Sequence, residues 1–110
     1  MQFLVVIRGN EASILPPAQE MALVRETFEQ LASGKDKRIK AVYPFVGERA
    51  GAILCEAATP EELQECLMSL PFWRLVRAEC HVVGTPKALA DQLGRMEQQM
   101  AGLTASAGRH

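Results

Sequence analysis

The chain has 110 residues and a formal net charge of −1. This length indicates one domain, and the mixed charge gives no electrostatic reason to expect nucleic acid or an anionic membrane as a partner. No apolar run approaches the roughly 20 residues of a membrane span. The apolar start also lacks the features of a signal peptide. Cys55, Cys66 and Cys80 show no metal-like spacing, so we interpret them as reduced, buried thiols of a cytoplasmic protein.

The first predicted strand covers residues 3–8 and is apolar on both faces, so both faces are expected to be covered. One face carries Phe3, Val5 and Ile7, and the other carries Leu4, Val6 and Arg8. A helix is predicted after Pro16 and Pro17, and Ser33-Gly34 ends it. The helical spacing places one apolar stripe on this helix, formed by Met21, Val24, Phe28 and Leu31.

A β-hairpin is predicted next, with strands at residues 39–46 and 50–57 around Gly47. Pro44 cannot donate a hydrogen bond to a neighbouring strand, which predicts that the first of these strands is an edge. Thr59 then caps a helix, with Glu62 in position to close a capping box and Pro60 at the first helical position. The apolar stripe of this helix is Leu63, Cys66, Leu67 and Leu70.

After Pro71 the pattern changes to the period of two that is typical of a strand, over residues 72–83. One face of this strand is predicted to carry Leu75, Arg77, Glu79 and His81. Thr85 and Pro86 begin a last helix, with a stripe of Leu89, Leu93, Met96 and Met100. Residues 1–102 are predicted to form the single domain, and residues 103–110 a flexible tail.

The order of elements, β-α-β-β-α-β with an extra C-terminal helix, predicts an α+β, ferredoxin-like fold. Both helices of this arrangement cover one face of an antiparallel sheet. The other face is still apolar, and an exposed apolar sheet face is a liability. We therefore expect a homodimer or higher oligomer that pairs these faces. The residues assigned to this face are Leu4, Val6, Ala52, Leu54 and Leu75.

The polar side chains of the strand after Pro71 are the main candidates for chemistry. His81 titrates near neutrality and can carry a proton, with Glu79 beside it as orienter or second base. Arg77 can hold a carboxylate of a small-molecule ligand. The alternative is a structural network in which these charges pair across a dimer interface.

Further substrate-binding candidates flank these residues. Glu56 ends a strand beside a helix start, Tyr43 can donate a hydrogen bond to a ligand carbonyl, and Arg8 ends the first strand. Leu4, Val6 and Leu75 would supply apolar contacts on the same face. His81 and His110 are the only histidines, and no phosphate-binding loop occurs, so no metal and no cofactor are expected.

Residues 47–83 carry a recognisable run of motifs. Glu56 after a strand is followed by a T-x-E-x-L helix and by the sequence L-M-x-L-P-F, which ends at Phe72. This run resembles the C-terminal half of the muconolactone isomerase family. The resemblance implies a dimeric α/β barrel and a cofactor-free proton transfer that shifts a double bond in a small lactone during the catabolism of aromatic compounds.

The chain differs from that family at Leu4 and Val6, where the isomerases carry polar or basic residues. These apolar residues favour a less polar ligand than a dicarboxylate lactone. The wider fold also contains cofactor-free monooxygenases and cyclases that act on aromatic or polyketide substrates, and a non-catalytic ligand-binding dimer module is a third alternative.

Overall fold

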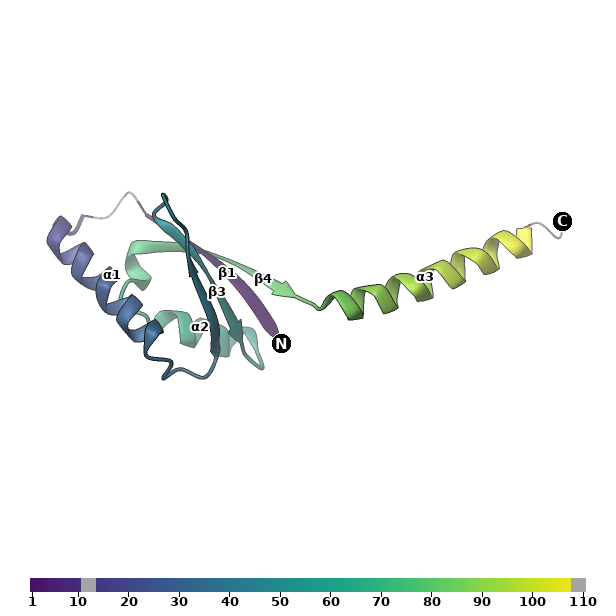
Figure 1. The fold of residues 1–110 in the computed structure, drawn as a ribbon, viewed down its shortest axis with the longest axis horizontal. Coiled ribbons are helices and arrows are strands. Elements are labelled where there is room, and N and C mark those ends of the chain that lie inside the picture. The colour runs from purple at the N-terminus through teal and green to yellow at the C-terminus, as the bar shows by residue number, and fades with distance from the viewer. Residues whose placement is uncertain (11–13, 108–110) are drawn as a thin grey trace.

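The computed structural model describes residues 1–10 and 14–107, with side chains through residue 103. Its elements are β1 (Gln2–Gly9), α1 (Pro17–Ala32), β2 (Ile39–Pro44), β3 (Ala50–Glu56), α2 (Pro60–Met68), the short 3₁₀ helix η1 (Trp73–Leu75), β4 (Val76–Val83) and α3 (Pro86–Ala107). The strands form one antiparallel sheet in the order β2-β3-β1-β4. α1 and α2 lie on the same face of the sheet (Figure 1). The predicted α+β, ferredoxin-like fold is therefore confirmed.

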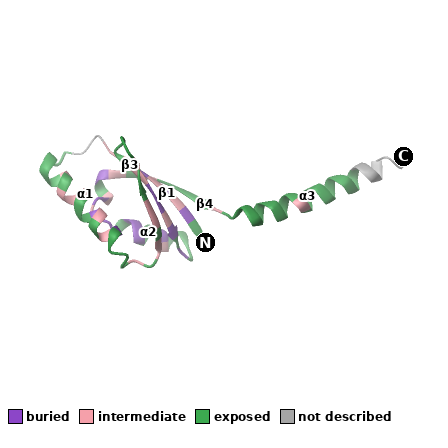
Figure 2. Ribbon diagram, in the orientation of Figure 1, coloured by how far each residue is buried: buried purple, intermediate pink, exposed green. Residues whose placement is uncertain are grey.

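The core lies between the sheet and the helices α1 and α2. The part of the core that β1 contributes is one face of the strand, as predicted, and the side chains on this face are buried. The side chains on the other face of β1 are half-buried or exposed (Figure 2). Because full burial of one large apolar side chain stabilises a fold by roughly 1.5–3 kcal/mol, this layer provides most of the driving force for folding. The main members of the core are Phe3, Val5, Ile7, Ile53, Leu63, Leu67, Leu70 and Phe72.

The inward stripe of α1 differs from the predicted one at its first member. Val24, Phe28 and Leu31 face the core as expected, but Met21 is 76% exposed. The residue that continues the inward row is Glu20, one helical turn before Val24. Met21 lies three residues before Val24 and Glu20 lies four before it, so either could continue the same helical face. The prediction selected Met21 because it is apolar, and this selection was wrong.

The start of α2 and the end of β2 follow the signals predicted from the sequence. The Thr59 hydroxyl accepts a hydrogen bond from the Glu62 backbone N–H at 3.2 Å. The Glu62 carboxylate accepts one from the Ala58 N–H at 2.9 Å, one residue before the position that a standard capping box uses. Pro44 closes β2, which is an edge strand as predicted.

Leu75 does not lie on the outer face of the sheet, so that prediction was wrong. Its N–H donates to the Phe72 carbonyl at 2.8 Å, and the N–H of Trp73 donates to the Leu70 carbonyl at 3.0 Å. These bonds form η1, and β4 begins only at Val76. Because a 3₁₀ turn interrupts the alternation of a strand, Leu75 turns inward and is buried in the core.

The thiols are all free, but only two are buried as predicted. Cys55 and Cys66 lie in the core between β3 and α2, whereas Cys80 is exposed. Cys80 lies directly across from the buried Val5 and so on the helix side of the sheet. It is exposed because β4 is an edge strand that the helices leave uncovered, as the exposure of Val82 on the same side also shows.

α3 extends away from the rest of the molecule, so that the structure measures 74 Å along its longest axis (Figure 1). It continues past the expected boundary at Gly102 to Ala107. The remainder of the predicted tail, residues 108–110, lies outside the described residues. Within the described residues 1–10 and 14–107, no helix is long and apolar enough to cross a membrane.

Candidate functional site

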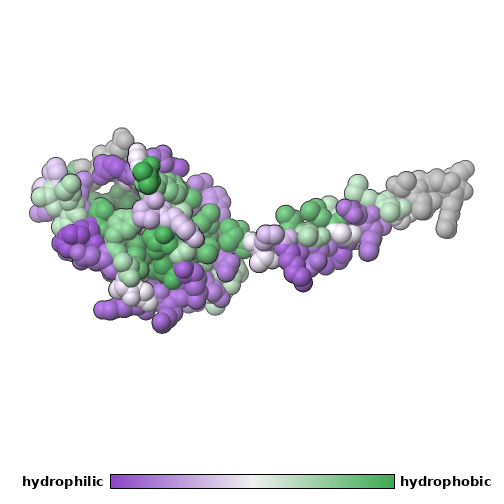
Figure 3. All heavy atoms as spheres, viewed as in Figure 1, coloured by the Kyte–Doolittle hydropathy of each residue, from purple (hydrophilic) through white to green (hydrophobic). Residues whose placement is uncertain are grey.

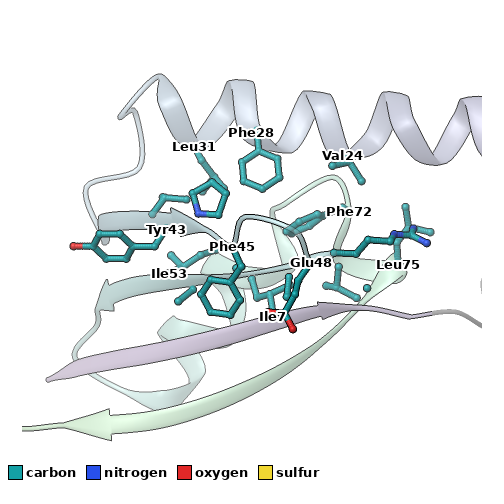
Figure 4. A pocket seen from close by; sticks show the side chains of 18 of the residues that line it. Ile7, Val24, Phe28, Leu31, Tyr43, Phe45, Glu48, Ile53, Phe72 and Leu75 are labelled. Carbon is teal, nitrogen blue, oxygen red and sulfur yellow. The ribbon is translucent and has the colours of Figure 1, made fainter.

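A cavity of about 250 Å³ lies between α1 and the sheet. α1 provides its roof and the inner faces of β1, β2 and β3 its floor, with Phe72 between them and Leu75 towards one end (Figure 4). An apolar cavity of roughly 150 Å³ is enough to admit benzene. This cavity therefore has room for a ring with substituents. Its apolar lining includes Ile7, Val24, Phe28, Leu31, Val42 and Ile53.

Charged side chains are gathered among the cavity-lining residues of α1 and the β2–β3 turn. The Glu20 carboxylate lies 3.7 Å from the Arg49 guanidinium, and their side chains are 22% and 75% exposed respectively. Glu48, beside Arg49, lies 3.8 Å from Arg8. An exposed ion pair contributes little to stability. The position of the Glu20–Arg49 pair is therefore its more important property, because both residues belong to the lining of the cavity.

Close backbone contacts hold the Arg49 end of the hairpin against β1. The Gly9 N–H donates to the Arg49 carbonyl at 2.8 Å. A Cβ on Gly51 would lie 3.1 Å from the Tyr43 carbonyl oxygen, so this close approach of β2 and β3 favours glycine. Gly47, with φ of 83°, allows the turn itself. The glycines of β1 and of the hairpin therefore allow the backbone geometry that places Arg49 next to β1.

The outer face of the sheet carries the side chains that the sequence predicted as a site. The register aligns Arg77 with Arg8, Glu79 with Val6 and His81 with Leu4, so these residues share one face. A shallow hollow of about 220 Å³ is lined by Val6, Arg8, Arg77, Ala78 and Glu79.

His81 is outside the residues that line this hollow. Its Nε2 atom lies 3.5 Å from a carboxylate oxygen of Glu79, and the two side chains are 51% and 68% exposed. The structure therefore places the predicted proton carrier on an open surface. Within the single chain, the apolar cavity and the histidine lie on opposite faces of the sheet.

Tyr43 on β2 and Glu56 on β3 are separated by β1 from the polar side chains of β4. Tyr43 lies on the edge strand β2 along the wall of the cavity, with its hydroxyl directed away from the interior (Figure 4). Glu56 pairs with Lys40 at 3.7 Å. Glu56 lies opposite Gln2, at one end of β1, and Arg8 lies at the other end. At 3.3 Å per residue these two predicted site residues are roughly 20 Å apart. Leu75 lines the cavity instead of the outer face.

Sequence reasoning missed Glu20 and Arg49. A signal for Glu20 was present, since a carboxylate four residues before Val24 lies on the inward side of the helix. Arg49 carries no such signal, because its position depends on the folded hairpin and its contact with β1.

A third polar cluster lies near the start of β2. Arg38 donates two hydrogen bonds to Asp36, at 3.0 and 2.9 Å, and this contact lowers the pKa of Asp36 to about 2. Cys66 Sγ donates to Asp36 at 3.5 Å. Hydrogen bonding to Cys55 and burial raise the pKa of Cys66, so it is a neutral thiol at pH 7 and a poor nucleophile. Among the described residues, no group of three potential metal ligands occurs.

Similarity to solved structures agrees with this architecture. A crystal structure of muconolactone isomerase matches with a TM-score of 0.63 and 20% identity, over 78% of this chain and 92% of that one. The 5-chloro-2-hydroxyhydroquinone dehydrochlorinase of Burkholderia phenoliruptrix AC1100, in complex with 2,5-dihydroxybenzoquinone, matches with a TM-score of 0.56 and 17% identity, over 80% and 98%. No protein-family model and no curated protein matches the chain in sequence. The chain thus has the ferredoxin-like fold that these two enzymes share.

Proposed function

We propose that this protein is a cofactor-free enzyme that binds a small, single-ring metabolite between α1 and the sheet and moves a proton on it. The observation that carries the proposal is an apolar cavity whose lining includes two carboxylates, Glu20 and Glu48, and one guanidinium, Arg49. Small-molecule sites typically combine an apolar lining with a few polar groups that fix the orientation of the ligand. At about 250 Å³ the cavity is smaller than the sites of drug-sized ligands.

Glu20 and Arg49, which lie 3.7 Å apart, take different roles in this chemistry. Arg49 is the more exposed and can turn to pair with an anionic substituent or a developing enolate oxygen. Glu20 then removes a proton from the carbon next to the ligand carbonyl. Return of that proton at another carbon shifts a double bond, with no net gain or loss of atoms. Phe28 and Phe72, whose rings meet edge to face at 6.2 Å, offer a surface for the ring of the ligand.

The structural relatives support this class of ligand. One is an isomerase named for a lactone, and the other was solved with a single-ring dihydroxyquinone. A double-bond isomerisation of a lactone-type metabolite in the catabolism of aromatic compounds is the reaction that we favour. The second candidate location is the outer face, because Arg77, Glu79 and the small hollow beside Val6 occur there together.

The same substitution, valine to phenylalanine, made at each of the two candidate sites distinguishes between them. Val24→Phe adds bulk in the cavity, and Val6→Phe adds bulk in the outer hollow. Calorimetry with muconolactone and with 2,5-dihydroxybenzoquinone would measure binding, and NMR in D₂O would measure deuterium uptake by the lactone. We expect Val24→Phe to weaken binding by about tenfold or more and Val6→Phe to leave it unchanged. The reverse result would place the site on the outer face, and binding of neither probe would contradict this substrate class.

A further inference from the structure

α3 carries a narrow, exposed apolar seam along its length. Its large apolar residues are spaced alternately by four and three positions and are 48% to 72% exposed. Figure 3 shows apolar atoms along one side of the helix and polar atoms along the other. The members of the seam are Leu89, Leu93, Met96, Met100 and Leu103.

The width and period of the seam indicate what it packs against. A helix that covers a sheet or a globular core carries about three apolar residues in seven, whereas a seam of two in seven with a period of 3.5 is typical of a coiled coil. α3 has the second pattern, with Leu93 and Met100 at a positions and the other three residues at d positions. The expected partner is therefore another helix with the same spacing.

The sequence of α3 also favours a partner for its stability. Gly94 and Gly102 both lower the helix propensity of this segment, and most helices depend on packing of an apolar face for their stability. Because α3 leaves the body beyond the edge strand β4 (Figure 1), the body does not obstruct the approach of a second helix along the seam.

We propose that α3 pairs with α3 of a second copy of this chain in a short, parallel coiled coil. Parallel, in-register pairing joins each of the five seam residues to its own equivalent. Antiparallel pairing sets a positions against d positions, so five residues cannot all be matched. A homo-oligomer with twofold symmetry is also the commonest soluble assembly.

The charges beside the seam favour an identical partner over a different protein. Charged e and g positions usually set partner choice in coiled coils. Here these positions carry Ala90, Glu97, Gln92 and Gln99 through residue 103. In the parallel arrangement the neutral Gln92 lies opposite Glu97 of the other copy, so no like charges face each other. Through residue 103, Glu97 is the single charged residue at an e or g position, so these positions offer little charge by which a different protein could be selected.

Cysteine cross-linking tests the pairing in the full-length chain. Cys80 is the exposed thiol among the native cysteines and is first removed as Cys80→Ser. Leu89→Cys then places a thiol in the seam, and the matched control Asp91→Cys places one on the outer side of the same turn. Under mild oxidation with glutathione disulfide at micromolar protein, we expect the Leu89→Cys dimer to form on the order of 100-fold faster than the control.

A second variant shows whether the seam is the cause. Leu93→Lys combined with Met96→Lys should reduce cross-linking of Leu89→Cys to the rate of the control, while the fluorescence of Trp73 in the body stays unchanged. Equal rates for Leu89→Cys and Asp91→Cys would overturn the proposal. Cross-linking that survives the two lysines would overturn it as well.

Discussion

Glu20 in the first turn of α1 and Arg49 in the β2–β3 turn lie 3.7 Å apart among the residues that line the cavity. The helix supplies the carboxylate from its inward row, and the hairpin supplies the cation from a turn held against β1. Glu20 is mostly covered, while Arg49 is mostly exposed. This difference makes the carboxylate the fixed group of the pair and the guanidinium the adaptable one.

Glu20→Gln should abolish proton transfer without unfolding the protein. The amide keeps the size of the side chain but cannot accept the proton, so turnover of a lactone substrate should fall by about 10²–10⁴-fold. Glu26→Gln is the matched control, because Glu26 lies on the exposed side of the same helix. Steady-state kinetics would compare both variants with the parent. Turnover by Glu20→Gln at the parent rate would exclude Glu20 as the base.

The outer-face hypothesis makes a separate prediction. If His81 carries the proton, His81→Gln should keep the fold and abolish turnover, and Arg77→Met should mainly raise KM. The exposure of His81 leads us to expect parent-like kinetics from both variants within about twofold. Loss of turnover in His81→Gln with full activity in Glu20→Gln would favour the outer face.

The fold could be predicted from the sequence because local signals agree with one another. The Thr59 cap, the Pro44 edge and the alternation of β1 each depend on neighbouring residues alone. Leu75 was misplaced because η1 depends on hydrogen bonds to Leu70 and Phe72, which the period of two does not reveal.

The candidate site was less predictable for the same reason. The alternation placed Arg77, Glu79 and His81 on one face correctly. The cavity, however, arises where α1 passes over the sheet, and its volume depends on how residues distant in sequence pack. Glu20 could be inferred from the helical row that contains Val24, while Arg49 required the folded hairpin.

Thr27 should contribute to stability although it lies outside the charged pair. Its hydroxyl is completely buried, donates to the Leu23 carbonyl at 2.8 Å and accepts from the Phe72 N–H at 2.9 Å. Thr27→Val keeps the shape but leaves the buried N–H without an acceptor, at a cost of about 1–3 kcal/mol in the free energy of unfolding. Urea denaturation would measure this cost. Thr27→Ser retains the hydroxyl and should lose less; a larger loss in Thr27→Ser would contradict this account.

Asp36 should make stability depend on acid pH. Contact with Arg38 lowers its pKa from 3.8 to about 2, so the folded state favours the ionised form. Its contribution, about 1–2 kcal/mol, is present above the unfolded-state pKa and is lost as pH falls through the folded value.

Urea denaturation of Asp36→Asn tests that dependence. The variant should be less stable than the parent at pH 7, and the difference should shrink as pH falls from about 4 towards 2. Glu29→Gln, which breaks the exposed pair with Arg25, is the control and should change stability by about 0.5 kcal/mol or less. A difference for Asp36→Asn that is independent of pH would exclude the ion pair as its cause.

The outer sheet face should form a second contact between copies. Leu4, Val6 and Leu54 are half-buried on this face, and Ala52 lies among them in register. Light scattering of the α3 variant with lysine at positions 93 and 96 isolates this contact, because the helical seam is then disrupted. We expect that variant to remain a dimer at micromolar concentration. Adding Leu54→Lys should convert it to a monomer, since pairing would bury an uncompensated charge. Gln2→Lys, at the exposed end of β1, is the control and should leave the dimer intact. A monomer before Leu54→Lys is introduced would show that the sheet faces do not pair.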